Sequence, residues 1–226
     1  MTLAAKTIVY DWNGTLFDDT SIACHCNSLI AEQLGYPAIS LDTFQQYWDW
    51  PIDQLYRGLG FSEAAITKTY DLMNSFHKNY EPLADKAPLR KDAAELLVFA
   101  HARNFKQVIL SDYMLEPIDR QINRLKVAPF ITKILANASR ERQFHDGSKG
   151  ERLRHYLANN GLEPRQTIIV GDSPEETYIA RSLGLISVAI TGGFVSEQRL
   201  RGPQPDYLIH SFSELPAILH ERGFTA

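Results

Sequence analysis

The chain has 226 residues, of which 44% are hydrophobic and 22% charged, the composition of an ordinary globular protein with one large domain or a medium domain carrying an insertion. Its formal net charge is −4, and no Lys/Arg cluster stands out, which argues against a surface for nucleic acid. The longest apolar runs have the length of strands and fall far short of a membrane span, so no contact with a membrane is predicted.

The spacing of the two cysteines indicates whether the protein resides in an oxidising or a reducing compartment. Cys24 and Cys26 are too close in sequence for an unstrained framework disulfide, which predicts free thiols in a reducing cytoplasm. The first residues lack the apolar core and the small-residue cleavage site of a signal peptide. We therefore expect a cytoplasmic protein, whose oligomeric state the sequence leaves unknown.

Five short β-rich runs recur along the chain, with helical patterns between them. They cover residues 6–10, 106–111, 167–171, 185–190 and 206–209. Continuous apolar strands that alternate with helices are typical of a parallel sheet covered on both faces. The sequence thus predicts an α/β protein with a doubly wound, Rossmann-like parallel sheet.

Three helices are predicted between these strands. The first covers residues 89–104, where apolar residues recur on one face. The second covers residues 149–159, and Gly161 suits a left-handed cap after its end. The third has Ser173 as its N-cap and ends at Gly184.

Residues 17–85 interrupt the alternation of strands and helices. They carry helical patterns, three turn signals and no convincing strand, and a proline-punctuated linker over residues 81–89 follows. This block predicts a helical cap domain over residues 17–85, inserted into a core domain of residues 1–16 and 86–226. Both connections would lie near the carboxyl edge of the sheet, where doubly wound folds bind their ligands.

Polar residues stand at the ends of the first two predicted strands. Asp11 follows the first strand and precedes the turn at Asn13 and Gly14, whose backbone amides can point at an anion. Turns of this composition usually just reverse the chain. Ser111 ends the second strand, where its hydroxyl can donate to a phosphate or cap the next helix.

A candidate cation is Lys149, which opens the second predicted helix after a glycine turn. Most lysines in such a place are solvated, but the helix dipole mildly disfavours a cation there, which hints at another reason for the charge. Lys133 is the alternative, although its apolar surroundings favour an edge-strand or snorkelling lysine.

Acidic residues follow the third strand. Asp172 comes directly after it, and Glu175 and Glu176 lie in the first turn of the next helix, where the dipole alone favours them. Asp172 and Asp11 would place two carboxylates at one sheet edge, where they would repel each other. A hard divalent cation resolves this repulsion, and Mg²⁺ is typically held by one or two carboxylates together with waters and phosphate oxygens.

The four positions are more informative together than singly. Asp, Ser, Lys and Asp, each at or just beyond a strand end, supply what phosphoryl transfer requires. They provide a nucleophile, a hydrogen bond, a cation and a metal ligand.

With these motifs the chain resembles the haloacid dehalogenase superfamily, and within it the phosphatases with a helical cap, similar to phosphoglycolate phosphatase. The matching stretches are YDWNGTLFDD, VILSDY, Lys149 and IIVGDSPEETYIARSLGL, and the resemblance covers nearly the whole chain. It implies a Mg²⁺-dependent phosphohydrolase that acts on a small phosphorylated metabolite through a phosphorylated Asp11.

The resemblance also implies residue roles. Asp11 would be the nucleophile, Ser111 would bind the transferring phosphoryl group, and Lys149 would neutralise charge between them. The implied Mg²⁺ ligands are Asp11, the backbone carbonyl of Asn13, Asp172 and Glu176, with Glu175 as a nearby substitute. The predicted substrate contacts are Asn13, Gly14, Ser111, Asp112 and, from the cap, Arg57.

Asn13 departs from the family, which mostly has Asp at this place as acid to the leaving group and base to the water. An amide can orient those groups but exchanges no proton, and such general acid–base catalysis is worth about 10²–10⁴-fold. Three interpretations stay open. In the first, the enzyme favours activated phosphates (acyl phosphates or pyrophosphates) or phosphoryl transfer. In the second, another residue supplies the acid, and in the third the protein only binds a phosphorylated ligand. The nearest candidates for another acid are Asp18, Asp19 and His25.

Overall fold

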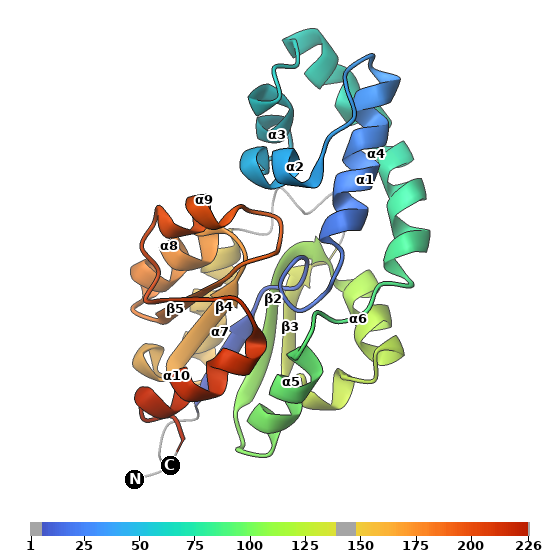
Figure 1. The fold of residues 1–226 in the computed structure, drawn as a ribbon. Coiled ribbons are helices and arrows are strands. Elements are labelled where there is room, and N and C mark those ends of the chain that lie inside the picture. Colours follow the sequence, from blue (N-terminus) through green and yellow to red (C-terminus); the bar gives the residue numbers. More distant parts are fainter. Residues whose placement is uncertain (1–5, 139–147, 226) are drawn as a thin grey trace.

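The computed structural model describes residues 6–138 and 148–225, which form a parallel sheet with a group of helices standing above one of its edges (Figure 1). The sheet has six strands in the order β3-β2-β1-β4-β5-β6, and every neighbouring pair is parallel. The strands are β1 (Thr7–Tyr10), β2 (Lys106–Met114), β3 (Lys133–Asn137), β4 (Thr167–Gly171), β5 (Ile186–Ile190) and β6 (Tyr207–Ile209). The predicted α/β class and doubly wound sheet are confirmed.

Alternating side chains of the central strands point to opposite faces of the sheet, as a period of two requires. On one face Val9 and Ile169 pack with residues of α7 (Lys149–Asn159) and α8 (Pro174–Leu183). On the other face, Ile8 and Ile168 join the cluster that contains residues of three helices. These helices are α5 (Ala93–His101), α6 (Leu115–Arg124) and α10 (Leu215–Glu221).

Two predicted helices agree closely with the structure. Helix α7 covers the predicted residues 149–159, and α8 begins after Ser173, whose hydroxyl accepts from the Glu175 amide, and ends at Gly184 with φ 73°. The helix predicted at 89–104 is shorter, because Asp92 is left-handed with φ 63° and α5 starts only after it. The remaining short helical segments are α9 (Glu197–Arg201) and 3₁₀ turns at Ala128–Phe130, Pro164–Gln166 and Phe212–Glu214.

The strand predictions missed one element and misjudged one end. Strand β3 was not among the five predicted strands; it is a half-buried edge strand that begins at exposed Lys133, so its apolar signal is weak. The interpretation of Lys133 as an edge-strand lysine is confirmed. Strand β2 does not end at Ser111 but continues to Met114, with a register shift after Leu110.

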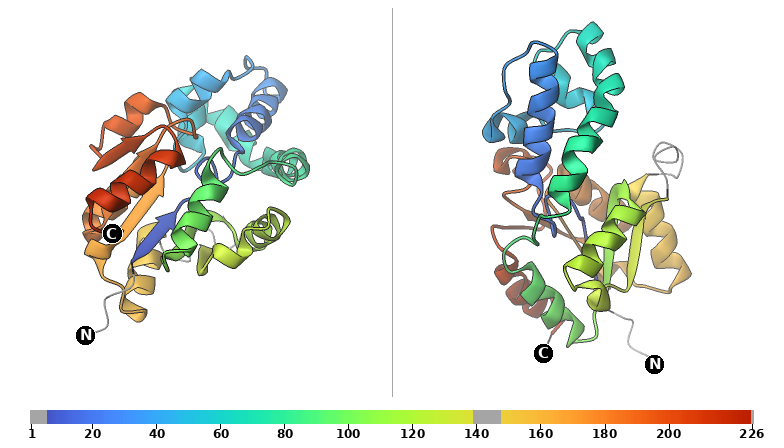
Figure 2. Two further views of the ribbon diagram at one scale, coloured as in Figure 1. Left: turned by 60° about the horizontal axis from the view of Figure 1, so that its bottom comes forward. Right: turned by 90° about the vertical axis from the view of Figure 1, so that its right-hand side faces the viewer.

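The helical block lies between β1 and β2, where an insertion was predicted. It comprises α1 (Thr20–Gln33), α2 (Leu41–Tyr47), α3 (Asp53–Gly58) and α4 (Glu63–Ala84). The two long helices α1 and α4 pack side by side and rise from the core (Figure 2). Helix α4 continues through Pro82 to a fully buried Ala84, so the linker predicted from residue 81 begins only after the helix. The boundaries at residues 17 and 85 stay a prediction.

Two further features of the described residues are the state of the cysteines and the apolar character of the helices. Cys24 and Cys26 are free thiols, and both are buried in α1. None of the described helices has the length and apolar character needed to cross a membrane.

The packing of α5 on the sheet makes a prediction about stability. Leu97 is fully buried, whereas its neighbour Val98 is 50% exposed. We expect Leu97→Ala to lower the free energy of unfolding by about 2–5 kcal/mol, because it leaves a cavity. The control Val98→Ala should change it by no more than about 0.5 kcal/mol. Urea denaturation of both variants checks this, and equal losses would contradict the assigned face of the helix.

Candidate active site

The strand order brings three of the predicted site residues together. Because β1 lies between β2 and β4, Asp11 after β1, Ser111 in the last part of β2 and Asp172 after β4 meet at one carboxyl edge. Asp11 continues the pairing with β4, since its amide donates to the Val170 carbonyl at 2.9 Å. Asp11, Ser111 and Asp172 are all buried at this edge.

Lys149 reaches the same place from the first turn of α7. Its Nζ donates to Asp11 Oδ1 at 2.9 Å and to Glu176 Oε1 at 2.5 Å, and it lies 3.7 Å from Glu175 Oε2. The Ser148 capping box fixes the start of the helix, while the glycine turn predicted before it lies outside the described residues. Burial opposes the charge, but the attraction of Asp11 and Glu176 outweighs it and raises the pKa of Lys149 well above its ordinary value.

The carboxylates at this edge repel one another. Burial raises the pKa of Asp11 well above its usual value, and Glu176 and Asp172 add to the rise while Lys149 opposes it. Burial also raises the pKa of Asp172, and Glu176 contributes to that shift. Burial raises the pKa of Glu175 to about 7. Lys149 hydrogen-bonds two of these acids, while Arg90 and Arg152 add a weaker attraction on Asp172 and Glu175. The four acids still outnumber these three cations, a charge balance that favours an additional cation.

The donor set fits Mg²⁺ in part. Asp11 and Asp172 would supply two hard carboxylate groups directly after neighbouring strands, and Mg²⁺ commonly takes one or two protein carboxylates, filling its other positions with water and phosphate oxygens. Glu176 is turned elsewhere, since its two oxygens accept from Lys149 and Ser173. In the described part of the chain, no three His, Cys, Asp or Glu side chains form a ready-made metal cluster. A site of two carboxylates agrees with that.

Asp172 is held by groups that the sequence did not single out. Its Oδ1 accepts from Thr15 Oγ1 at 2.7 Å and its Oδ2 from the Phe194 amide at 2.5 Å. Glycines 14 and 193 approach it so closely that a Cβ on either would overlap the carboxylate. These contacts fix the carboxylate from two segments of the chain, residues 14–15 and 193–194.

Ser111 and Asp112 are tied to α7 through Arg152. The guanidinium donates to the Ser111 carbonyl at 3.0 Å, to Asp112 Oδ1 at 2.6 Å and to Asn137 Oδ1 at 3.2 Å. Ser111 Oγ accepts from the Tyr113 amide at 3.1 Å, which uses a lone pair and not the hydroxyl hydrogen. The alternative interpretation of Ser111 as a helix cap is wrong, because the N-cap of α6 is Met114.

Asn13 is held by a buried acid from the start of the cap. Its Nδ2 donates to Asp19 Oδ2 at 2.8 Å and to Tyr80 Oη at 3.0 Å. Burial raises the pKa of Asp19 to about 6, although the hydrogen bonds from Tyr80, Asn13 and Gly14 act to lower it. Asp18 and His25, the other candidate acids, are both exposed.

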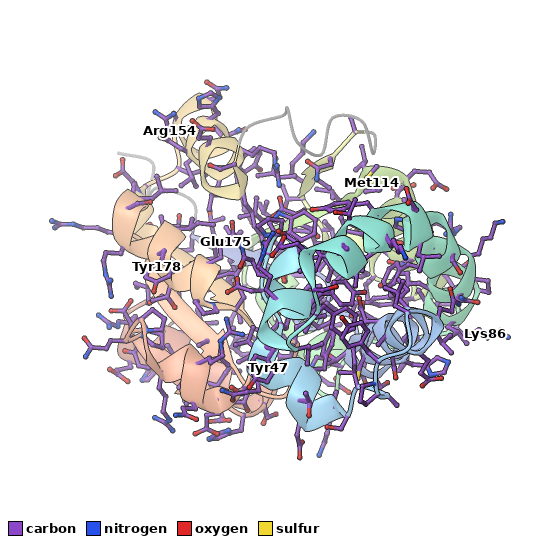
Figure 3. The ribbon with its side chains drawn as sticks, turned by 90° about the horizontal axis from the view of Figure 1, so that it is seen from above. Tyr47, Lys86, Met114, Arg154, Glu175 and Tyr178 are labelled. Atoms are coloured by element: carbon purple, nitrogen blue, oxygen red, sulfur yellow. The ribbon has the colours of Figure 1, made fainter. Side chains whose placement is uncertain are left out.

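One predicted residue, Arg57, lies outside this network. Arg57 pairs with Asp53 and Glu63 inside the cap, at 3.0 Å to Glu63, and no contact among the described residues links it to Asp11. Glu175, by contrast, lies in the first turn of α8 within 3.7 Å of Lys149 Nζ, and the view from the cap side places it near the middle of the molecule (Figure 3). A role for Arg57 toward substrate stays a prediction.

Several residues of the site were missed by the sequence reasoning. Arg152 lies one helical turn after Lys149, and this spacing alone indicates that both side chains share one face of α7. Thr15 completes the Asn-Gly-Thr turn already singled out. Tyr80, Arg90 and Phe194 carried no local signal. Arg90 donates to the carbonyls of Gly14 and Thr191 at 2.8 and 2.6 Å.

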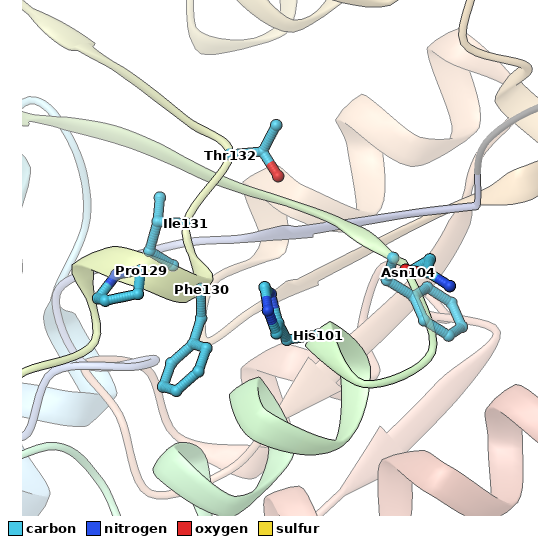
Figure 4. Close-up of a pocket in the computed structure, with 7 residues that line it drawn as sticks. His101, Asn104, Pro129, Phe130, Ile131 and Thr132 are labelled. Atoms are coloured by element: carbon cyan, nitrogen blue, oxygen red, sulfur yellow. The ribbon is translucent and has the colours of Figure 1, made fainter.

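A separate shallow cavity of 260 Å³ lies at the opposite edge of the sheet (Figure 4). Its lining comes from residues 101–105 and 129–132, which precede β2 and β3. His101 is its one titratable side chain. This cavity therefore does not belong to the candidate active site.

The comparisons agree with this geometry. The profile of the haloacid dehalogenase-like hydrolase family matches residues 8–190, and the chain belongs to that family. A phosphoglycolate phosphatase of Synechococcus elongatus is 25% identical over 210 residues, covering 93% of this chain and 95% of the relative. A protein of Caldanaerobacter subterraneus, provisionally named pyrophosphatase PpaX, is 22% identical and covers 94% and 93%.

Solved structures show the same fold. A haloacid dehalogenase-like family hydrolase of Streptococcus pneumoniae superimposes with a TM-score of 0.78 at 24% identity, covering 95% of this chain and 98% of that one.

The tight approach of Gly14 to Asp172 gives a prediction with a matched control. Gly14 and Gly35 both have positive φ, 70° and 80°, but only at Gly14 would a Cβ meet the carboxylate and Phe194. Gly35→Ala should cost about 1–2 kcal/mol of unfolding free energy from φ alone. Gly14→Ala should cost roughly 1–3 kcal/mol more because of overpacking. Equal values by chemical denaturation would contradict the close approach.

Proposed function

We propose that this protein is a Mg²⁺-dependent phosphatase that hydrolyses a small phosphorylated metabolite through a phosphorylated Asp11. The observation that carries the proposal is the buried Lys149 bridge between Asp11 and Glu176, with Asp172 on the adjacent strand. Membership of the haloacid dehalogenase-like hydrolases and the phosphoglycolate phosphatases among its relatives support the same activity.

Each residue has a distinct task in this proposal. Lys149 holds Oδ1 of Asp11 and neutralises charge, while Oδ2 attacks the phosphorus and the bond to the leaving oxygen breaks with its electron pair on that oxygen. Ser111 donates its hydroxyl hydrogen to a phosphate oxygen. Water then attacks the aspartyl phosphate, the bond from phosphorus to Oδ2 breaks, and the water's proton passes to solvent. Mg²⁺ held by Asp11 and Asp172 would neutralise phosphate charge.

A second candidate function concerns the leaving group. Asn13 lies where an acid is expected, and its amide has no proton to exchange with an alkoxide. Acyl phosphates and pyrophosphates need no such proton, and one relative is provisionally named as a pyrophosphatase. Hydrolysis or transfer from activated phosphates is therefore the alternative within the same site. A protein that only binds a phosphorylated ligand is the third possibility, which the next experiment separates from the others.

The nucleophile is tested by Asp11→Asn. We expect it to abolish Mg²⁺-dependent phosphate release from acetyl phosphate and 2-phosphoglycolate, because an amide oxygen forms no stable acyl phosphate. Intact-mass analysis after rapid quenching should show one phosphoryl group on the natural chain and none on the variant. Turnover by Asp11→Asn equal to that of the natural chain would refute the proposal, and ligand binding without any turnover would favour the binding protein.

The metal site is tested by removal and substitution. Chelation by EDTA should stop phosphate release, and added Mg²⁺ should restore it. Asp172→Asn removes one carboxylate ligand and should raise the Mg²⁺ concentration for half-maximal rate at least about tenfold. Full activity in EDTA would be incompatible with a metal-dependent reaction.

A further inference from the structure

Asp19 uses its carboxylate in an unusual way for its position. It occupies the N-cap of α1, yet its side chain makes no capping hydrogen bond to that helix. Instead Oδ1 accepts from the Gly14 amide at 2.8 Å, and Oδ2 accepts from Asn13 Nδ2 at 2.8 Å and from Tyr80 Oη at 2.5 Å. Three donors thus converge on a side chain that is fully buried.

This arrangement fixes which way the Asn13 amide points. Asn13 turns its NH₂ group toward Asp19, since Nδ2 is the atom that donates to the carboxyl group at 2.8 Å. The same nitrogen also donates to Tyr80 Oη at 3.0 Å, so both hydrogens of the NH₂ group are used in hydrogen bonds. All recorded contacts of the amide among the described residues are therefore made by Nδ2. The atom left for a ligand is Oδ1, which can only accept.

We propose that Asp19 and Tyr80 are positioning residues that hold Asn13 as a hydrogen-bond acceptor, and that the carboxylate at position 19 excludes one at position 13. An acceptor-only amide orients a water molecule but passes no proton to a leaving oxygen. The site therefore selects phosphates whose leaving group departs without protonation, the class of acyl phosphates and phosphoanhydrides. This inference rests on the proposed phosphatase function.

The contact between Asn13 and Asp19 means that the two residues must be exchanged together. Asn13→Asp alone does not recreate a working acid. Two carboxylates placed where an amide now donates at 2.8 Å cannot both be ionised, and the single proton they share is held between positions 13 and 19 instead of pointing at the leaving oxygen. Exchanging both residues reverses the hydrogen bond: with Asn13→Asp and Asp19→Asn together, the amide at position 19 donates to a carboxylate at position 13. That carboxylate keeps its second oxygen for proton exchange with a leaving group.

The test is a double-mutant cycle of the natural chain, Asn13→Asp, Asp19→Asn and the double variant. Each protein is assayed with Mg²⁺ on acetyl phosphate and on 2-phosphoglycolate, an alkyl phosphate, with kcat and KM separated. Thermal unfolding is measured in parallel, so that a loss of fold is not mistaken for a loss of activity.

We expect the natural chain to favour acetyl phosphate. Each single variant should lose kcat on it by about 10²-fold, with KM little changed, because the group at position 13 is misplaced. The double variant should recover that loss and gain at least about 10²-fold on the alkyl phosphate, the value of a general acid. This reversal is a readout that a purely structural role of Asp19 would not produce.

Tyr80→Phe keeps the ring stacked on Phe76 and removes the hydroxyl. It should lower kcat in the same direction as Asp19→Asn. The matched control is Tyr56→Phe, a buried cap tyrosine whose hydroxyl donates to Asn27, and it should leave kcat unchanged.

The outcomes distinguish the inference from the function beneath it. If Asp11 is phosphorylated but Asn13→Asp alone gains the alkyl phosphate as fully as the double variant, Asp19 imposes no constraint and the inference fails. A natural chain with equal kcat on both substrates would also overturn it, since no leaving-group selection then exists. Absence of phosphorylation and turnover in all four proteins would overturn the phosphatase function, and the inference with it.

Discussion

The site depends on one buried ammonium group placed among carboxylates. Lys149 is 5% exposed and donates to acids on two other elements, Asp11 after β1 and Glu176 on α8. A buried charge without partners is very costly, so the start of α7, the end of β1 and the first turn of α8 must meet at one place for the fold to be stable. In the proposed reaction, Asp172 on the neighbouring segment would supply the second carboxylate for a divalent cation beside the phosphoryl group.

The sequence predicted those elements whose signal is local. Continuous apolar strands, the Ser173 cap, the Gly184 exit and the placement of Lys149 at a helix start follow from properties of a few adjacent residues. Strand β3 was missed because it is an edge strand, which buries only part of its surface, and because it begins with a lysine. The partners of Asp172 and Ser111 were missed because they are distant in sequence. Thr15 lies 157 residues from Asp172, and Arg152 lies 41 residues from Ser111. Such contacts depend on the order of strands, which no local pattern encodes.

Asn13 illustrates how far a motif can be interpreted without its surroundings. From the sequence, Asp18, Asp19 and His25 are comparable neighbours that could each compensate for a missing acid. The start of α1 separates them, because it turns Asp19 back into the protein and leaves Asp18 and His25 in solvent. The buried acid contacts the amide itself, so the departure from the family is part of a hydrogen-bonded set that includes Tyr80 of the cap.

The cap and the chemistry share a second connection, through the loop after β5. Phe194 donates its amide to Asp172, and its ring packs against Phe44 and Trp48 of the cap with centroids 5.7 and 4.8 Å apart. Gln45 of α2 donates to the Gly193 carbonyl at 2.7 Å beside it. The cap therefore contacts both sides of the reaction centre, Asn13 through Tyr80 and Asp172 through Phe194. A displacement of the cap would therefore disturb the contacts of Asn13 and of Asp172 together, because each is linked to a cap helix by side-chain contacts. If the cap chooses the substrate as proposed, that choice and the positioning of these two groups depend on the same packing.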